Sequence, residues 1–299
     1  MRKTWSAVIA LVLVTGLAAS VEAQRREMTA EERARRAQEQ QAQLQAELQL
    51  ERPVAALNSV WIEELTYLEV RDALADGKTT AIISTGGIEQ NGPYVATGKH
   101  NYILQTACEW IARELGDALC APIIKLVPEG DIDEPSGHMR YPGTISLREE
   151  TFEAVLTDVG SSLAQHGFEH IIYIGDSGGN QRGMENVAAA LNVKWTDGGA
   201  RAHFIPEFYD NSGLTAYMND ELGIEEPVSD GFHDFYWITA LQMVTDPSTV
   251  RYEERVAKDL ATINGVSIAP KEETIEVGKK LMQWRVDQTV RAIHAARSH

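Results

Sequence analysis

Short apolar segments rich in β-branched residues alternate with longer segments of helical periodicity along most of this chain. Four segments have the composition of buried strands: residues 80–84, 121–127, 170–174 and 202–207. Helical spacing and capping signals lie before, between and after them, at residues 66–76, 101–115, 146–166, 181–195, 212–222, 234–244 and 272–297. Strands that alternate with helices form a sheet covered by helices on both faces. We therefore expect a three-layer α/β/α sandwich with a largely parallel sheet.

The first of these strands leads directly into a polar loop. Gly86 and Gly87 follow the strand, and Glu89 and His100 come within the next fourteen residues. In open α/β sheets, ligands bind beyond the carboxyl ends of the strands. A carboxylate and an imidazole in this loop are therefore well placed to form a functional site.

Three further segments place chemically active side chains near predicted strand or helix ends. The loop 128–143 is long and rich in proline, glycine and acidic residues, and it carries His138. The third strand runs into a glycine-rich turn that contains Asp176, and a histidine, His233, precedes a later helix. Long loops in compact domains are usually functional. We therefore add His138 to the candidate site, together with Asp176 and His233, which lie at predicted strand and helix ends.

The first 52 residues have a different composition from the rest of the chain. Residues 1–23 hold two basic residues, an uncharged apolar run and small residues where signal peptidase cuts, which predicts a secretory signal peptide. Residues 24–52 are rich in Glu, Arg, Gln and Ala and predict a charged stalk, helical or disordered. We expect residues 53–299 to form the α/β domain, in the periplasm or outside the cell, with no stable membrane span once the signal is removed.

Charge and cysteine content limit the partners and the redox state. The full chain has 27 basic and 44 acidic residues, and removing residues 1–23 leaves 25 and 43, a net charge of −18. Such a surface repels phosphate backbones and anionic lipids, so we expect no nucleic-acid or membrane partner. Cys108 and Cys120 either form a disulfide in an oxidising compartment or remain buried free thiols.

Four segments in sequence resemble motifs of the creatininase (creatinine amidohydrolase) family. They are GGIEQNGPYVATGKH, SGHMRYPGTISL, HGFEHIIYIGDSGGN and GFHDFYWITA, and their order and spacing agree with the family across roughly residues 60 to 245. They are similar to the family patterns GxxEQHGPHLPLxTD, EHxxFPGTISL, HGFxxIxxxNGHGGN and HAGxxETS. The resemblance implies a homo-oligomer, a hexamer in this family, that hydrolyses amide C–N bonds of small molecules with a dinuclear zinc or manganese centre.

Several of the family's metal ligands are replaced in this chain. Glu89 matches a metal-binding glutamate, but Asn91 stands where the family has a ligand histidine and His100 where it has a bridging aspartate. Ser177 replaces another histidine, and Ile238 replaces the glutamate of the last motif. Because serine and isoleucine remove electron-pair donors, the usual two-metal centre cannot form as such.

This chain could still form a site for one divalent metal ion with a ligand set different from the family's. A catalytic zinc needs only three protein ligands and an open position, and we expect Glu89, His100 and Asp176 to supply them for zinc or manganese. His233 matches a general acid/base of the family and His138 a histidine of the second motif, so His233, His138 and Glu89 are the candidate catalytic residues.

Each candidate also has a purely structural interpretation. His100 could start the following helix, Asp176 could serve as a turn residue, and His138 could orient its loop. Ser177, within the sequence GDSGG, suggests a serine nucleophile, but no triad is evident.

These observations leave three hypotheses about function. The first is an exported metal-dependent amidohydrolase, and the second is a non-catalytic binding protein that keeps the fold without its metals. The third makes the stalk an assembly or envelope-tethering element. Metal analysis of the purified protein separates the first two.

Overall fold

The computed structural model describes residues 29–196 and 198–298 and divides the chain into two units, Met1–Ala55 and Ala56–His299. The predicted signal peptide lies outside the described residues. In the first unit, helix α2 (Ala30–Leu48) begins at a capping box formed by Thr29 and Glu32, and none of its residues is buried. This part of the predicted stalk is therefore a solvent-exposed helix.

The second unit is built on a sheet of four parallel strands. These are β1 (Thr80–Thr85), β2 (Ala118–Cys120), β3 (His170–Gly175) and β4 (Arg201–Phe204), in the spatial order β2-β1-β3-β4. Every residue of β1 is buried. An uncharged strand covered on both faces is typical of a parallel sheet, and the predicted arrangement is confirmed.

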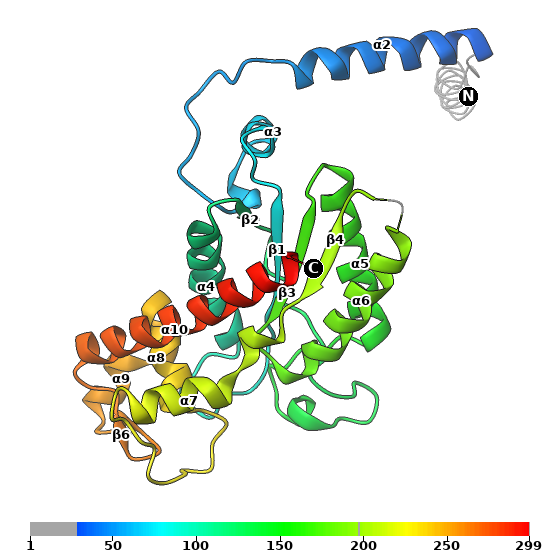
Figure 1. Ribbon diagram of the computed structural model, residues 1–299. Helices are drawn as coiled ribbons and strands as arrows, with labels where there is room; N and C mark the ends of the chain where they lie inside the picture. The colour runs from blue at the N-terminus through cyan, green and yellow to red at the C-terminus, as the bar shows by residue number, and fades with distance from the viewer. Residues whose placement is uncertain (1–28, 197, 299) are drawn as a thin grey trace, which may run out of the picture. The chain divides into compact units, whose positions relative to one another are not determined.

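Helices cover both faces of this sheet (Figure 1). On one face α4 (Lys99–Leu115) packs against β1 and β2, and α10 (Lys271–Arg297) packs against α4, α8 (Tyr236–Thr245) and β4. On the other face α5 (Glu149–Gln165) and α6 (Gln181–Lys194) pack against β3. The three-layer α/β/α sandwich predicted from the alternation of strands and helices is confirmed.

The remaining elements are short. They are α3 (Tyr67–Ala75), α7 (Asn211–Asp220), α9 (Tyr252–Ala257), a hairpin of β5 (Thr262–Ile263) and β6 (Val266–Ser267), and the 3-10 turns η1 (Ile62–Glu64), η2 (Gly137–Arg140), η3 (Gly178–Asn180), η4 (Pro206–Tyr209) and η5 (Pro247–Val250). Neither α9 nor this hairpin was predicted from the residue pattern. No helix within residues 29–196 and 198–298 combines the length and the apolar character needed to cross a membrane.

Two strand predictions were wrong in their bounds. The second strand is Ala118–Cys120 rather than 121–127, because Pro122 has no N–H to continue the ladder; beyond it Ile124 and Val127 form only isolated bridges. The fourth strand ends at Phe204 rather than 207, because Pro206 begins η4. In both cases proline sets the boundary.

The two cysteines form a disulfide that joins α4 to β2. Cys108 and Cys120 are fully buried and twelve residues apart in the sequence. Closing a loop of this length stabilises a protein by about 3 kcal/mol in the chain-entropy treatment. We expect the Cys108→Ala/Cys120→Ala variant to unfold about 5–10 °C below the wild type.

Thermal unfolding followed by circular dichroism measures this difference. A reducing agent should lower the midpoint of the wild type and leave that of the variant unchanged. Equal midpoints for the two proteins without reductant would show that the cross-link contributes nothing to stability.

Candidate active site

The candidate site lies where the strand order changes direction. The chain runs from β1 outward to β2 and then returns to place β3 on the other side of β1. The loops that follow β1 and β3 therefore diverge from neighbouring positions, and ligands of open α/β sheets bind at such a switch point. Glu89 comes from the loop after β1, and Asp176 is the first residue after β3.

Two asparagines fix the backbone where β1 ends, and one of them ties it to the turn after β3. Asn180 donates hydrogen bonds through its side-chain amide to the carbonyl oxygens of Thr85 and Gly86, at 3.1 and 2.9 Å. The Asn101 side chain donates to the Gly87 carbonyl at 3.0 Å and accepts from the Gly87 N–H at 3.3 Å. A Cβ atom at Gly86 would overlap the Asn101 side chain, so only glycine fits this turn.

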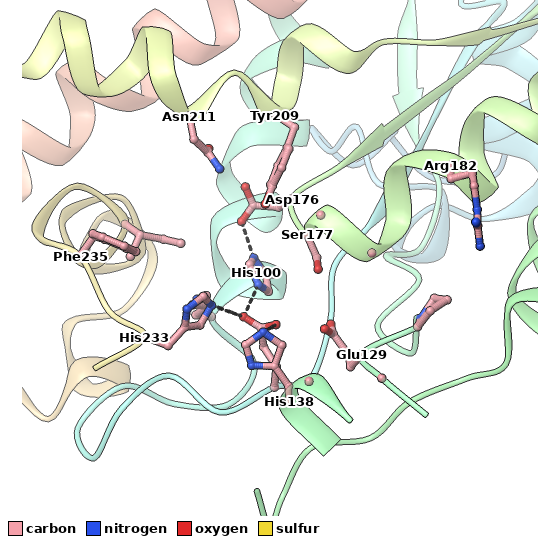
Figure 2. Close-up of a pocket in the computed structure, with 18 of the residues that line it drawn as sticks. His100, Glu129, His138, Asp176, Ser177, Arg182, Tyr209, Asn211, His233 and Phe235 are labelled. Atoms are coloured by element: carbon pink, nitrogen blue, oxygen red, sulfur yellow. Dashed lines mark hydrogen bonds and ion pairs between the residues drawn. The ribbon is translucent and has the colours of Figure 1, made fainter. Parts of the chain in front are cut away.

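His100 lies between two buried carboxylates. Its Nε2 atom is 2.9 Å from Glu89 Oε1, and its Nδ1 atom is 2.8 Å from Asp176 Oδ2 (Figure 2). The other oxygen of Asp176 accepts a hydrogen bond of 2.6 Å from Arg285 Nη1 of α10. Burial opposes the charged form of His100, but the hydrogen bonds to Asp176 and Glu89 prevail and raise its pKa.

The structure thus brings the three predicted metal ligands together, but as a hydrogen-bonded chain. Both ring nitrogens of His100 face carboxylate oxygens, and both oxygens of Asp176 have a donor. In this arrangement His100 has no free lone pair for a metal ion. Metal binding by Glu89, His100 and Asp176 stays a prediction, and the structure offers a second set of ligands beside it.

That second set consists of Glu89, His138 and His233. His138 Nε2 is 3.2 Å from Glu89 Oε2, and His233 Nε2 is 3.2 Å from Glu89 Oε1. One ligand atom from each of the three residues lies within 4.8 Å of the other two. Burial lowers the pKa of His138, which favours the neutral imidazole that a metal ion binds. Two imidazoles and one carboxylate are a donor set used by catalytic zinc, so these residues fit a divalent metal ion.

A cavity of about 670 Å³ opens next to these residues. Tyr209, Phe235 and Trp237 contribute aromatic rings to its lining. Arg182 lies at another part of the lining, away from Phe235 (Figure 2). All the predicted site residues, Glu89, His100, His138, Asp176 and His233, line this cavity. The volume suits a small-molecule substrate.

The replaced family ligands have other surroundings. Asn91 is fully buried and donates to the backbone carbonyls of Glu89 and Ala96 at 2.9 and 3.1 Å, so it fixes the loop. Ser177 and Ile238 line the cavity and are buried. The Ser177 hydroxyl has no histidine partner among the hydrogen bonds of the described residues.

Two residues of the site were missed in the sequence. Lys99 is 2% exposed, and its Nζ atom is 3.1 Å from Glu89 Oε1. Glu129 is 6% exposed, and its Oε1 atom has no hydrogen-bond partner among the described residues. Burial and the negative charge of Glu89 raise the pKa of Glu129 to about 9. The sequence held one signal for each of these residues. Glu129 lies in the long loop 128–143 that was predicted to be functional, and Lys99 is the neighbour of His100.

Comparison with known proteins decides the family. A model of the family described as creatinine amidohydrolase matches residues 63–293 of this chain. The chain belongs to the creatininase family. The resemblance seen in the four sequence motifs is thereby confirmed.

Curated relatives of this creatininase-family protein have several activities in their names. A creatinine amidohydrolase of Pseudomonas putida is 26% identical over 114 residues, which are 38% of this chain and 43% of that protein. A mycofactocin precursor peptide peptidase of Mycolicibacterium smegmatis is 24% identical over 139 residues, 45% of this chain and 53% of that protein. A 3-dehydro-scyllo-inosose hydrolase of Thermotoga maritima is 26% identical over 129 residues, 43% of this chain and 38% of that protein. The matches span about half or less of each relative, and all three names describe hydrolases.

Solved creatininase structures share the fold of this chain. A manganese form of creatininase superposes with a TM-score of 0.58 at 20% identity, covering 80% of this chain and 98% of that one. A mutant creatininase of the Zn-Zn type gives a TM-score of 0.57 at 19% identity, with the same coverage. The family therefore includes zinc-bound and manganese-bound proteins with this architecture.

Proposed function

We propose that this protein is a metal-dependent hydrolase that cleaves the C–N bond of a small amide in the cavity beside Glu89. The observation that carries the proposal is the convergence of one buried carboxylate and two imidazoles, Glu89, His138 and His233, on that cavity. Zinc or manganese would be held by these three residues. When bound, it would supply a Lewis acid that polarises the amide carbonyl and acidifies water.

The other residues of the cavity would position the reactants. His100 holds the Glu89 carboxylate at one oxygen and is itself fixed by Asp176 and Arg285, so Glu89 keeps one orientation. Glu129 offers a carboxyl oxygen without a partner among the described residues, and we assign to it proton transfer to the leaving nitrogen. Tyr209, Phe235 and Trp237 would pack against the apolar part of the substrate.

Hydrolysis of a panel of small amides tests this function. A lactam, an imide, a hydantoin and a linear amide are incubated with the protein after loading with zinc or manganese, and amine or acid release is measured. We expect turnover of at least one class, a drop of about a hundredfold or more after chelation, and recovery on adding metal back. Glu129→Gln should keep the metal and lower kcat by about 10²-fold or more.

The competing function is a binding protein without chemistry. One observation favours it: the buried negative charges of Glu89 and Asp176 are already offset by Lys99 and Arg285. A pocket balanced in this way can remain folded without a metal ion. A protein that binds small amides but releases no product with any metal would support this alternative.

We also propose that the protein is exported. The disulfide between Cys108 and Cys120 supports an oxidising compartment, since such bonds are rare in the reducing cytosol. Fractionation of cells that express the full chain tests this, with a chain lacking residues 1–23 as the control. The full chain should be found outside the cytoplasm and the shortened chain inside.

A homo-oligomer remains part of the proposal. Phe232 is 47% exposed and Phe235 is 41% exposed, and both lie on the segment that carries His233. Large apolar side chains exposed on the surface are candidates for a subunit interface. Light scattering of the purified protein gives the oligomer size, and a monomer would remove this part of the proposal.

A further inference from the structure

The most unusual charged group in the cavity is Lys99. It is the first residue of α4, its side chain is 2% exposed, and it lines the cavity beside Glu89. Lysine is almost never fully buried unless it is paired. The pairing partner here is Glu89, whose Oε1 atom is 3.1 Å from Lys99 Nζ.

The ion pair with Glu89 does not occupy all the hydrogen-bond donors of the Lys99 ammonium group. An ammonium group has three N–H donors, and within residues 29–196 and 198–298 its interactions of hydrogen-bond or ion-pair distance are with Glu89. The same oxygen, Oε1, is also contacted by His100 at 2.9 Å and by His233 at 3.2 Å. The negative charge of Glu89 is therefore shared among several groups, and part of the charge of Lys99 is available to a molecule in the cavity.

The other cations near the cavity are differently placed. Arg285 is buried and engaged with Asp176 and Asn211. Arg182 lines the cavity, but its side chain is 75% exposed, where solvent screens its charge. Among the described residues that line the cavity, Lys99 is thus the one lysine or arginine held in a buried, low-dielectric position, where a fixed charge acts most strongly.

We propose that Lys99 is a catalytic residue whose ammonium group neutralises the negative charge that develops on the amide oxygen. This inference rests on the proposed hydrolase function. As the water oxygen forms its bond to the carbonyl carbon, the C=O electron pair moves onto oxygen and water gives up a proton. When the pair returns, the C–N bond breaks and the nitrogen leaves with a proton from the Glu129 carboxyl, which the proton given up by water restores, so that amide and water become acid and amine. The attraction between the ammonium group and the amide oxygen is strongest while the oxygen is negatively charged, so it stabilises the transition state more than the ground state.

The test compares the wild type with Lys99→Met, which keeps the length of the side chain and removes its charge. With the metal-loaded proteins and an amide that the wild type hydrolyses, we expect kcat to fall about 10²- to 10³-fold, while KM changes only a few-fold and the metal content stays the same. Acetate serves as an anionic probe of the metal-free proteins by calorimetry, and it should bind about tenfold more weakly to the variant.

A second variant keeps the proposal testable if Lys99→Met does not fold. Lys99→Ala is purified and assayed with and without ethylammonium, which should restore part of kcat, whereas tetramethylammonium, which has no N–H, should not. Unchanged kcat and acetate binding in Lys99→Met, or a folded Lys99→Ala that no amine rescues, would overturn the role of Lys99 alone. A wild type that hydrolyses no amide would instead overturn the proposed function, and with it this inference.

Discussion

Replacing Glu89 with glutamine is expected to lower kcat/KM for the hydrolysed amide by about 10³-fold. Glu89 is contacted by Lys99, His100, His138 and His233, so its carboxylate organises the buried ammonium group and three imidazoles of the cavity. Burial opposes its charge, yet the hydrogen bonds from His100 and His233 prevail and lower its pKa. The variant loses a negatively charged metal ligand. A 10³-fold fall in kcat/KM corresponds to about 4 kcal/mol less stabilisation of the transition state with the metal's help.

Steady-state kinetics together with metal analysis measure the effect. Glu150→Gln, in an exposed position of α5, is the matched control and should behave as the wild type. The Glu89→Gln protein should also retain less than one equivalent of zinc. Full activity in this variant would contradict any account that places the chemistry at this carboxylate.

Replacing Arg285 with methionine is expected to cost about 3–5 kcal/mol of the free energy of unfolding. Arg285 is 1% exposed and donates to Asp176 and to Asn211, at 2.6 and 2.9 Å. Its removal leaves the Asp176 carboxylate buried without its main counter-charge. Denaturant unfolding in the presence of a chelator measures this loss separately from metal binding.

Two further variants make this measurement specific. Arg291→Met changes an exposed position of the same helix and should lose less than about 0.5 kcal/mol. The double variant Arg285→Met/Asp176→Asn removes both charges and should recover part of the loss. If Arg285→Met were no less stable than Arg291→Met, the buried chain from Arg285 to Glu89 would not be a stabilising element.

The hydrogen-bonded side chains of Asp176 and His100 predict how the stability of the protein depends on pH. Burial raises the pKa of Asp176, but the charge of Arg285 and the hydrogen bond from His100 prevail and lower it. Its contribution is therefore complete above the ordinary value of 3.8 and is lost as the pH falls through the lower folded value. The pKa of His100 is raised, so its contribution is complete below 6.5 and is lost as the pH rises through the folded value. Both contributions are complete between these two ordinary values, so denaturant unfolding of the wild type at a series of pH values should show the largest stabilisation by this pair there.

The architecture and the location of the site could be predicted from the sequence. The uncharged run from Thr80 to Ser84 has the composition of a doubly covered strand, and Gly86 with Gly87 marks the point where it stops. Parallel strands bring their carboxyl ends to one edge, which is why Glu89 and Asp176 meet although 86 residues separate them in the sequence. Local patterns and the geometry of a parallel sheet were sufficient for this step.

The pairing of side chains within the site could not be predicted in the same way. Whether His100 binds a metal ion or two carboxylates depends on Arg285, which lies 185 residues further along the chain in α10. Lys99 was not singled out, because a lysine at a helix start usually extends into water, and only the packing of the cavity shows it to be buried. Long-range contacts of this kind have no signature in one sequence.

Zinc titration of the metal-free protein by calorimetry tests the central claim most directly. The wild type and the exposed-site control His166→Ala should each bind one equivalent, and His138→Ala and His233→Ala should both lose tight binding while remaining folded. Zinc binding that survives both substitutions but is lost in His100→Ala would contradict this ligand set, and no binding by the wild type would contradict a metal-dependent function.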